Sequence, residues 1–304
     1  MRCLFLIVAS LAVAGVASVG QVFSVNIVGY INLQLTPGLN LLVNQLAATT
    51  DDLNSFMPAV PDGTVVFRFD PVTQSYLDGV TFLDGVGWYP ASGAKGDSVK
   101  SIPLGEGFFV QIPGSTNFLV TFVGEVRLDS TNRIPGNYSL KGSILPLSGP
   151  LVVNLGFRAA DGDLVYQWDA VLQSFKSAAA YSIGNWQPEE PTIAIGEGFM
   201  LFRDPVQATP DNWWIRHFAI GPAVGAATPT APSDATAPAI QRLVLPTGNA
   251  RLDIRNPNGE AYDVQFSSDA STWKTVATHQ LSTQWTAPFT SGSRGYFRLT
   301  KSSY

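Results

Sequence analysis

The sequence predicts an all-β protein: two tandem copies of a small barrel-like or sandwich-like β-module, a linker rich in Pro, Ala and Thr, and a small C-terminal β-sandwich. Three observations predict this class. Hydrophobic residues make up 45 % of the 304 residues and charged residues only 13 %, a balance that does not suit long solvated helices. Short apolar runs are separated by turns rich in Gly and Pro. A series of short motifs also occurs twice in the same order.

The duplication sets the predicted domain boundaries. The block at residues 62–70 matches the block 99 positions later, at 161–169. The offset falls to 98 at Trp88 and Trp186 and to 91 at the Gly-Glu-Gly-Phe motif, which predicts an insertion near residues 91–100 of the first copy. The matched segments of the first copy are 62–70, 74–76, 87–88 and 104–108, and those of the second are 161–169, 173–175, 185–186 and 195–199.

Three further pairings extend the match upstream and downstream. Pro37-Gly38 pairs with Pro135-Gly136, and the run around Gly29 resembles those around Gly124 and Gly221. We place module 1 at residues 21–126 and module 2 at 127–222, followed by a flexible linker at 223–240 and the sandwich at 241–304.

The N-terminal segment predicts export. Met1 and Arg2 precede an apolar run from Cys3 to Val19, which is typical of a secretory signal peptide, and we bound it at residues 1–20. A membrane anchor is the alternative, but the run is short for a bilayer span and no Lys or Arg follows it as a stop signal. We therefore expect a secreted or cell-surface bacterial protein with no membrane span after cleavage.

Cysteine and charge exclude several classes of function. The single cysteine, Cys3, falls in the segment to be removed, so disulfides, thiolate zinc sites and thiol catalysis are excluded from the mature chain. Residues 21–240 carry 19 Asp and Glu against 10 Lys and Arg. An acidic body argues against a nucleic-acid partner.

Within each module the pattern is that of strands and tight turns. Val65, Phe67 and Phe69 alternate with Val66, Arg68 and Asp70, so the two sets face opposite sides of a strand. Asp-Gly pairs between such runs favour tight turns. One short helix is expected at residues 50–56, capped by Thr or Asp, with Leu53 and Phe56 on one face. A weaker counterpart is expected at 151–157.

The C-terminal part contains six short strand candidates, spaced as in a small β-sandwich. They lie at residues 242–245, 250–254, 262–266, 273–277, 283–288 and 295–300.

The motifs also carry a resemblance. The sequence Gly38-Leu39-Asn40-Leu41 and the Gly-Glu-Gly-Phe motifs at 105–108 and 196–199 resemble an uncharacterised family of exported two-module β-proteins of Verrucomicrobia and related bacteria. In the second copy, Asn137-Tyr138-Ser139-Leu140 departs from the opening motif. The tail resembles a fibronectin type III-like module. This resemblance implies the fold and export, and it transfers no catalytic residue or ligand.

Catalytic, metal and cofactor chemistry find little support. Glu106 and Glu197 occupy equivalent positions and would be the carboxylates of a glycan-active hydrolase, but a Glu between two glycines is better explained as a turn residue. His217 and His279 lie on different predicted domains and are expected to have no carboxylate nearby. Neither a Gly-x-Ser-x-Gly motif nor a calcium loop is present. We expect no enzyme activity, no cofactor and no metal.

Aromatic residues are the remaining lead. Trp88 and Trp186 recur at one module position, which favours a core role. Trp213 and Trp214 are the candidate ligand-binding residues. Neighbouring strand residues face opposite sides, so one of the two indoles should point away from its own core. The other candidates are Trp168 and Trp273.

Together these points predict a secreted or cell-surface, non-catalytic structural, adhesion or binding protein. The alternatives are a carbohydrate-binding protein that uses exposed aromatics and a glycan hydrolase that uses Glu106 and Glu197. A polysaccharide or another envelope component is the expected class of partner, and the oligomeric state stays open.

Overall fold

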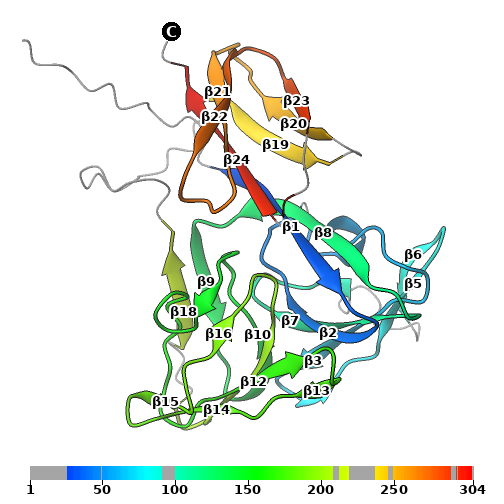
Figure 1. Ribbon diagram of the computed structural model, residues 1–304, viewed down its shortest axis with the longest axis vertical. Helices are drawn as coiled ribbons and strands as arrows, with labels where there is room; N and C mark the ends of the chain where they lie inside the picture. The colour runs from blue at the N-terminus through cyan, green and yellow to red at the C-terminus, as the bar shows by residue number, and fades with distance from the viewer. Residues whose placement is uncertain are drawn as a thin grey trace, which may run out of the picture.

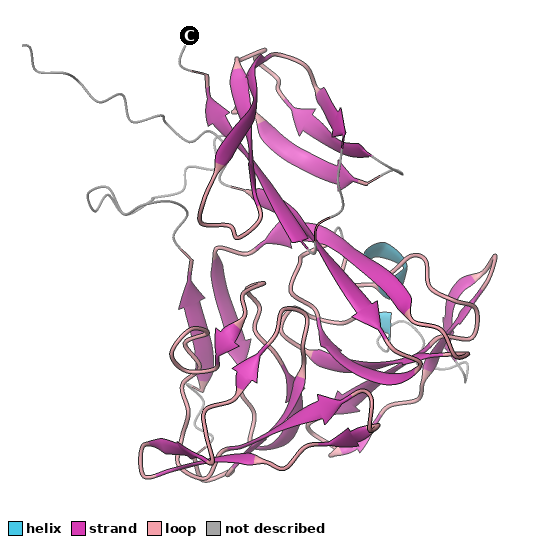
Figure 2. Cartoon of the chain, viewed as in Figure 1, coloured by secondary structure: helices cyan, strands magenta, loops and turns pink. Residues whose placement is uncertain are grey.

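The computed structural model describes residues 26–48, 50–90, 100–207, 212–218, 237–245, 249–288, 292 and 294–302. The described chain is nearly all β and forms several antiparallel sheets, which confirms the predicted fold class (Figure 2). The signal peptide, the run around Gly221 and residues 223–236 of the expected linker lie outside the described residues. Among the helices that are described, none has the length and apolar character needed to cross a bilayer.

Module 1 is built around a sheet with strand order β2-β7-β3-β5-β6. The buried core on one side of this sheet includes Val66, Val80, Trp88 and Phe108. The strands are β2 (Gly38–Val43), β3 (Val65–Asp70), β5 (Val80–Leu83), β6 (Gly87–Pro90) and β7 (Gly107–Ile112), and the short β4 (Ser75–Tyr76) pairs with β3.

Module 2 contains a sheet with the matching order β10-β17-β12-β14-β15. Its core includes Val165, Trp186, Phe199 and Leu201. The strands are β10 (Asn137–Lys141), β12 (Leu164–Asp169), β14 (Ala179–Ser182), β15 (Asn185–Gln187) and β17 (Phe199–Arg203), and β13 (Ser174–Phe175) pairs with β12. Two small ribbons complete this part: β11 (Gly149–Pro150) with β16 (Thr192–Ile193), and β9 (Asp129–Arg133) with β18 (Trp213–His217).

Strand register corrects one equivalence expected from the sequence. Leu41 pairs with Phe109 in module 1, and Leu140 pairs with Met200 in module 2. This register matches Gly38 with Asn137, and both have a positive φ, of 89° and 63°. The match of Gly38 with Gly136 is therefore wrong by one position. Asn is one of the few residues that tolerate this left-handed conformation, which explains why Asn137 replaces the glycine.

The two modules differ at the predicted helix. In module 1, α1 (Leu53–Phe56) forms as expected, because Asp52 Oδ1 accepts a hydrogen bond from Asn54 N at 2.8 Å and Leu53 and Phe56 are buried. In module 2, the weaker expectation at 151–157 is wrong. That segment makes hydrogen-bonded turns that bury Leu151 and Leu155 without an α-helix.

The C-terminal strands form two packed sheets and match all six predicted candidates. One sheet has the order β19-β20-β23, and the other carries β22, β21 and β24. The strands are β19 (Ala239–Val244), β20 (Asn249–Arg255), β21 (Tyr262–Ser267), β22 (Lys274–Gln280), β23 (Gln284–Pro288) and β24 (Arg294–Lys301). The first two residues of β19, 239 and 240, lie in the segment expected to be linker.

The C-terminal part shares a sheet with module 1. Strand β1 (Ile27–Leu35) lies between β24 and β8 (Phe118–Val126), as the adjacent blue, red and green strands in Figure 1 show. Gly29 pairs with Tyr296, and Tyr30 with Gly295. A Cβ at either glycine would lie 2.5 Å from the paired tyrosine ring. The two Gly-Tyr pairs therefore interlock, and β24 seals one edge of β1.

Candidate functional site

The two modules contact each other through equivalent groups. Gln173 Nε2 donates to Leu39 O at 3.0 Å, and its Oε1 accepts from Leu39 N at 2.7 Å. Gln74 makes the same two bonds to Tyr138, at 2.9 Å and 3.0 Å. Gln173 of module 2 binds β2 of module 1, and Gln74 of module 1 binds β10, the equivalent strand of module 2. The contact therefore has the reciprocal form of a two-fold symmetric interface.

Two isolated bridges repeat this reciprocity near the glutamates. Leu42 of module 1 pairs with Glu197 of module 2, and Lys141 of module 2 pairs with Glu106 of module 1. Leu42 and Lys141 are equivalent in strand register, since they lie opposite Phe108 and Phe199. The backbones of the modules are therefore joined by two equivalent bridges.

A hydrophobic cluster fills the space between the two sheets. Its buried centre consists of Leu41 and Phe109 from module 1 with Leu140 and Met200 from module 2. The face of β3 opposite the module 1 core thus lies against the other module. Partly buried residues surround this centre, most of them aromatic: Leu39, Phe67, Phe69, Tyr166, Trp168 and Phe175.

One side of this contact is hollow. The hollow has a volume of about 430 Å³ and is lined by Leu39, Phe67, Tyr76, Phe109, Gln111, Trp168 and Phe175. Trp168 is held in place because its Nε1 donates to Leu39 O at 2.9 Å. Its ring meets those of Phe109 and Phe175 edge to face, with centroids 4.9 Å and 5.0 Å away. Tyr76 is 46 % exposed and lies at the mouth. Burial raises the pKa of its phenol.

The opposite side carries bulkier residues at two positions. By strand register, Tyr138 corresponds to Leu39 and Phe202 corresponds to Gln111. The rings of Tyr138 and Phe202 lie 5.0 Å apart, and Tyr138 lies 6.4 Å from Tyr166, the counterpart of Phe67. These two exchanges add bulk on the opposite side, where Met200 also takes the place of Phe109.

Comparison with protein-family models, with curated proteins and with solved structures finds no match for this chain.

The two glutamates of the hydrolase hypothesis already have strong partners. Arg68 binds Glu106 with two hydrogen bonds, of 2.6 Å and 2.9 Å. Glu197 accepts from Gln167 Nε2 at 2.8 Å and from Ala194 N at 2.7 Å. Since Arg68 and Gln167 are 99 positions apart and lie opposite Phe108 and Phe199, each glutamate anchors a strand in the same way.

Lys141 is the most perturbed cation of the contact region. Burial lowers its pKa to about 8, while the neighbouring Glu106 opposes the shift. Its Nζ donates to Asn132 Oδ1 at 3.2 Å.

Trp213 and Trp214 occupy opposite faces of β18. The indole of Trp214 is 2 % exposed, donates to Leu155 O at 2.9 Å and meets Phe157 edge to face. Trp213 is 38 % exposed. A ligand platform needs an accessible ring, so this hypothesis now rests on Trp213 alone.

One expectation about the histidines is wrong. Pairing of β9 with β18 brings Asp129 to His217, with Oδ1 2.7 Å from Nδ1. The two residues are 88 positions apart in the chain, so only the fold brings them together. Both side chains are about four-fifths exposed, at 81 % and 79 %, where such a pair contributes little.

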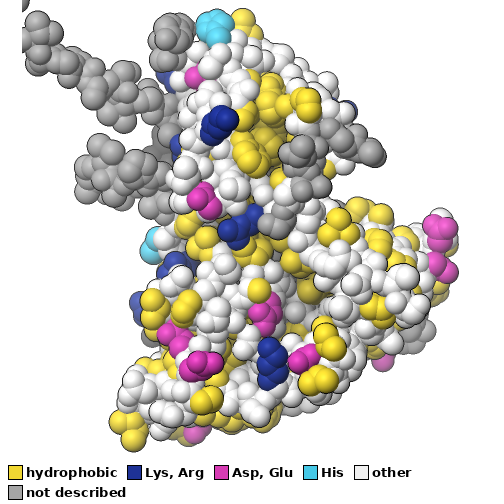
Figure 3. All heavy atoms as spheres, in the orientation of Figure 1, with side chains coloured by type: hydrophobic (Ala, Val, Ile, Leu, Met, Phe, Trp, Pro, Cys, Tyr) yellow, Lys and Arg dark blue, Asp and Glu magenta, His cyan; other side chains and the backbone are white. Residues whose placement is uncertain are grey.

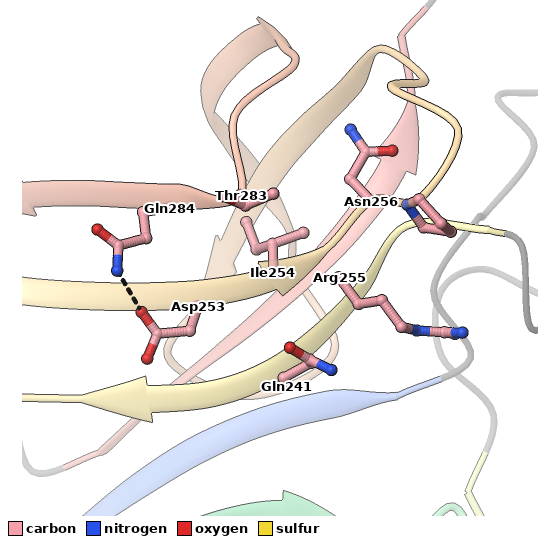
Figure 4. Close-up of a pocket in the computed structure, with 8 residues that line it drawn as sticks. Gln241, Asp253, Ile254, Arg255, Asn256, Thr283 and Gln284 are labelled. Carbon is pink, nitrogen blue, oxygen red and sulfur yellow. Dashed lines mark hydrogen bonds between the residues drawn. The ribbon is translucent and has the colours of Figure 1, made fainter.

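Two other hollows lie in the C-terminal part. A shallow one on the C-terminal part is lined by polar groups such as Gln241, Arg255 and Thr283, and Gln284 donates to Asp253 there at 3.2 Å (Figure 4). An apolar one lies between the C-terminal sheets, where hydrophobic atoms gather in Figure 3, and is lined by residues that include Phe266, Trp285 and Phe297. The described residues hold no group of three or more His, Cys, Asp or Glu arranged for a metal ion.

Among the residues that line the hollow, sequence reasoning named only Trp168 as a candidate for ligand binding. A signal existed for three of the others, Phe67, Tyr76 and Phe175. Their positions are aromatic in both copies at the same offset: Phe67 with Tyr166, Phe69 with Trp168, and Tyr76 with Phe175. Aromatic residues maintained on the strand face opposite the core indicate a second buried surface, here the contact between modules.

Proposed function

We propose that this protein is an exported, non-catalytic binding protein of the cell surface and that the hollow between the two modules is its ligand site. Export is supported by the N-terminal segment and by the family resemblance. The matching strand order and the offset of 99 support an origin by duplication. The observation that carries the binding role is the aromatic hollow itself, since its volume of about 430 Å³ falls in the range of small-ligand sites.

The chemistry of the lining favours a flat apolar group. Phe67, Phe109, Trp168 and Phe175 offer ring edges and faces, while Gln111 and Tyr76 supply polar groups. Burying one phenyl-sized group in such a place contributes about 1.5–3 kcal/mol. The ligand is therefore expected to insert one ring.

The engaged glutamates support the non-catalytic part of the proposal. A general acid or nucleophile must reach the substrate, and the carboxylate oxygens of Glu106 and Glu197 are already bound by Arg68, Gln167 and Ala194.

The hollow can be tested with a fluorescent probe. Anilinonaphthalene sulfonate, which brightens in apolar sites, should bind the mature protein saturably. The double variant Leu39→Tyr/Gln111→Phe places the module 2 residues in the hollow and should weaken this binding at least about tenfold.

The chain offers a matched control. Tyr138→Leu/Phe202→Gln places the module 1 residues on the other side and should add a second probe site. If the unmodified protein shows no saturable binding of the probe, or if Leu39→Tyr/Gln111→Phe binds it equally well, the hollow is not a ligand site.

A second candidate function is polysaccharide binding through β18. It is favoured by the exposed ring of Trp213, which pairs with Arg133 and neighbours the exposed Ile215. Trp213→Ala should release the protein from insoluble cellulose or chitin, whereas Tyr89→Ala, which removes another exposed ring, should not. Equal retention of both variants and the unmodified protein would remove this candidate.

A further inference from the structure

The reciprocal contact between the modules gives the hollow a filled counterpart within the same chain. Four of its aromatic positions are aromatic on both sides: Phe67 corresponds to Tyr166, Tyr76 to Phe175, Trp168 to Phe69, and Phe175 to Tyr76. On the module 2 side, the protein adds its own rings, Tyr138 and Phe202, whose centroids lie 5.0 Å apart.

We infer that the hollow is a site for one aromatic side chain, tyrosine or phenylalanine, presented by a polypeptide partner. This inference rests on the proposed function and names its ligand. In the counterpart, the phenol of Tyr138 lies among Tyr166 and Phe202 and stays 39 % exposed. A guest ring in the hollow would lie beside the equivalent residues Phe67 and Gln111, and Leu39 leaves the room that a tyrosine occupies on the other side.

The polarity of the lining separates an aromatic side chain from a sugar ring. A sugar brings several hydroxyls, and each one buried without a partner costs about 1–3 kcal/mol. The uncommitted side-chain polar groups of the hollow are the amide of Gln111 and the hydroxyl of Tyr76, since the Trp168 N–H already donates to Leu39 O. A phenol needs one partner, and a phenyl ring needs none.

The geometry of the rings points the same way. Aromatic side chains favour edge-to-face contact with centroids about 4.5–7 Å apart. The Phe109, Trp168 and Phe175 rings already have that arrangement, with interplanar angles of 80° and 82°. Another ring added at the open side would extend this network, as Tyr138 does on the other side through tilted contacts with Tyr166 and Phe202, at interplanar angles of 47° and 51°.

Fluorine NMR tests this inference directly on the mature chain. The signal of N-acetyl-4-fluorophenylalaninamide should broaden on adding the unmodified protein. It should stay sharp with Leu39→Tyr/Gln111→Phe, and broaden more with Tyr138→Leu/Phe202→Gln. Gln111→Phe alone is the second variant if the double variant does not fold, and circular dichroism checks each fold.

Competition then identifies the ligand class. N-acetyl-tyrosinamide and N-acetyl-phenylalaninamide should displace the fluorinated probe at concentrations about tenfold lower than N-acetyl-leucinamide, and cellohexaose should not displace it. Displacement by cellohexaose, or equal displacement by the leucine amide, would overturn the inference. If anilinonaphthalene sulfonate fails to bind, the proposed function itself fails; if it binds and the aromatic amides do not compete with it, only the aromatic ligand is excluded.

Discussion

Module 1 and module 2 use one strand order and one reciprocal contact but differ in the side chains that complete them. At the core edge, Thr64 and Ile112 of module 1 correspond to Asp163 and Arg203 of module 2. At the contact, Leu39 and Gln111 correspond to Tyr138 and Phe202, and Leu42 corresponds to Lys141. Strand register is therefore maintained while individual pairs change chemistry, and the hollow lies where Leu39 and Gln111 stand in place of the bulkier Tyr138 and Phe202.

The largest expected effect concerns the buried ion pair that only module 2 has. Arg203 Nη2 lies 2.6 Å from Asp163 Oδ2, and both side chains are almost fully buried. Asp163→Asn should lower the free energy of unfolding by about 3–5 kcal/mol, because it leaves a buried guanidinium without its carboxylate. Urea unfolding followed by tryptophan fluorescence measures this change.

The module 1 residues provide the control for this pair. Asp163 Oδ2 also accepts from Ala160 N, and the counterpart of Ala160 is Pro61, which has no N–H. The triple variant Ala160→Pro/Asp163→Thr/Arg203→Ile should therefore keep stability within about 1.5 kcal/mol of the unmodified protein. A loss as large as that of Asp163→Asn would show that the two core edges are not interchangeable.

The next effect concerns Lys141, the counterpart of Leu42. Burial disfavours the ammonium in the folded state, so this cost is fully present below pH about 8 and disappears above the ordinary lysine pKa of 10.5. Lys141→Leu should raise stability near pH 7 by up to about 3 kcal/mol.

The pH profile checks the cause. The unmodified protein should gain stability relative to Lys141→Leu between pH 8 and about 10. Above pH about 10, Tyr296 lowers the stability of both proteins alike, because burial raises its pKa to about 12 and the unfolded chain loses the phenol proton more readily. Parallel profiles for the two proteins would contradict the buried-cation explanation, and Leu42→Met is the matched control.

A smaller effect should distinguish the two equivalent tryptophans. Trp88 Nε1 donates to Met57 O, just after α1, at 2.8 Å, whereas the buried Trp186 Nε1 has no hydrogen-bond partner among the described residues. Trp88→Phe should cost about 1 kcal/mol more than Trp186→Phe, because only the first substitution removes a hydrogen bond. Thermal unfolding measures both, and equal losses would mean that Trp186 has a partner.

The smallest effect tests the corrected register. Asn137 has φ 63°, so Asn137→Ala should lower the free energy of unfolding by about 1 kcal/mol, while Asn137→Gly should change it by less than about 0.5 kcal/mol. Chemical denaturation resolves the difference. Equal stability of the two variants would argue against a left-handed residue at this position.

Local patterns predicted much of the fold. The alternation of side chains at 65–70 predicted β3, and the spaced apolar runs predicted the six C-terminal strands. The helix α1 was predicted from a cap at Asp52 and from the shared face of Leu53 and Phe56. These features depend on neighbours within a few residues, where capping, alternation and turn chemistry act. The one-position error at Gly38 arose because Asn137 performs the conformational role of a glycine that stands next to it in the sequence.

The candidate site was less predictable. Trp168 stood out as an aromatic residue, but nothing local marks Leu39 or Gln111 as members of the same site. Their importance comes from being smaller or more polar than Tyr138 and Phe202, and that comparison needs the register of β2 with β7 and of β10 with β17.

By itself, the sequence determined the all-β class and the positions of most strands, because those follow from contacts between residues close in the chain. Only the tertiary structure decided that Gly29-Tyr30 interlocks with Gly295-Tyr296. It also decided that Asp129 pairs with His217 and that Trp168 lines a hollow together with Leu39 of β2. These pairings join residues 88 to more than 250 positions apart, and many partners would satisfy the same local pattern. Packing of the whole chain selects one of them.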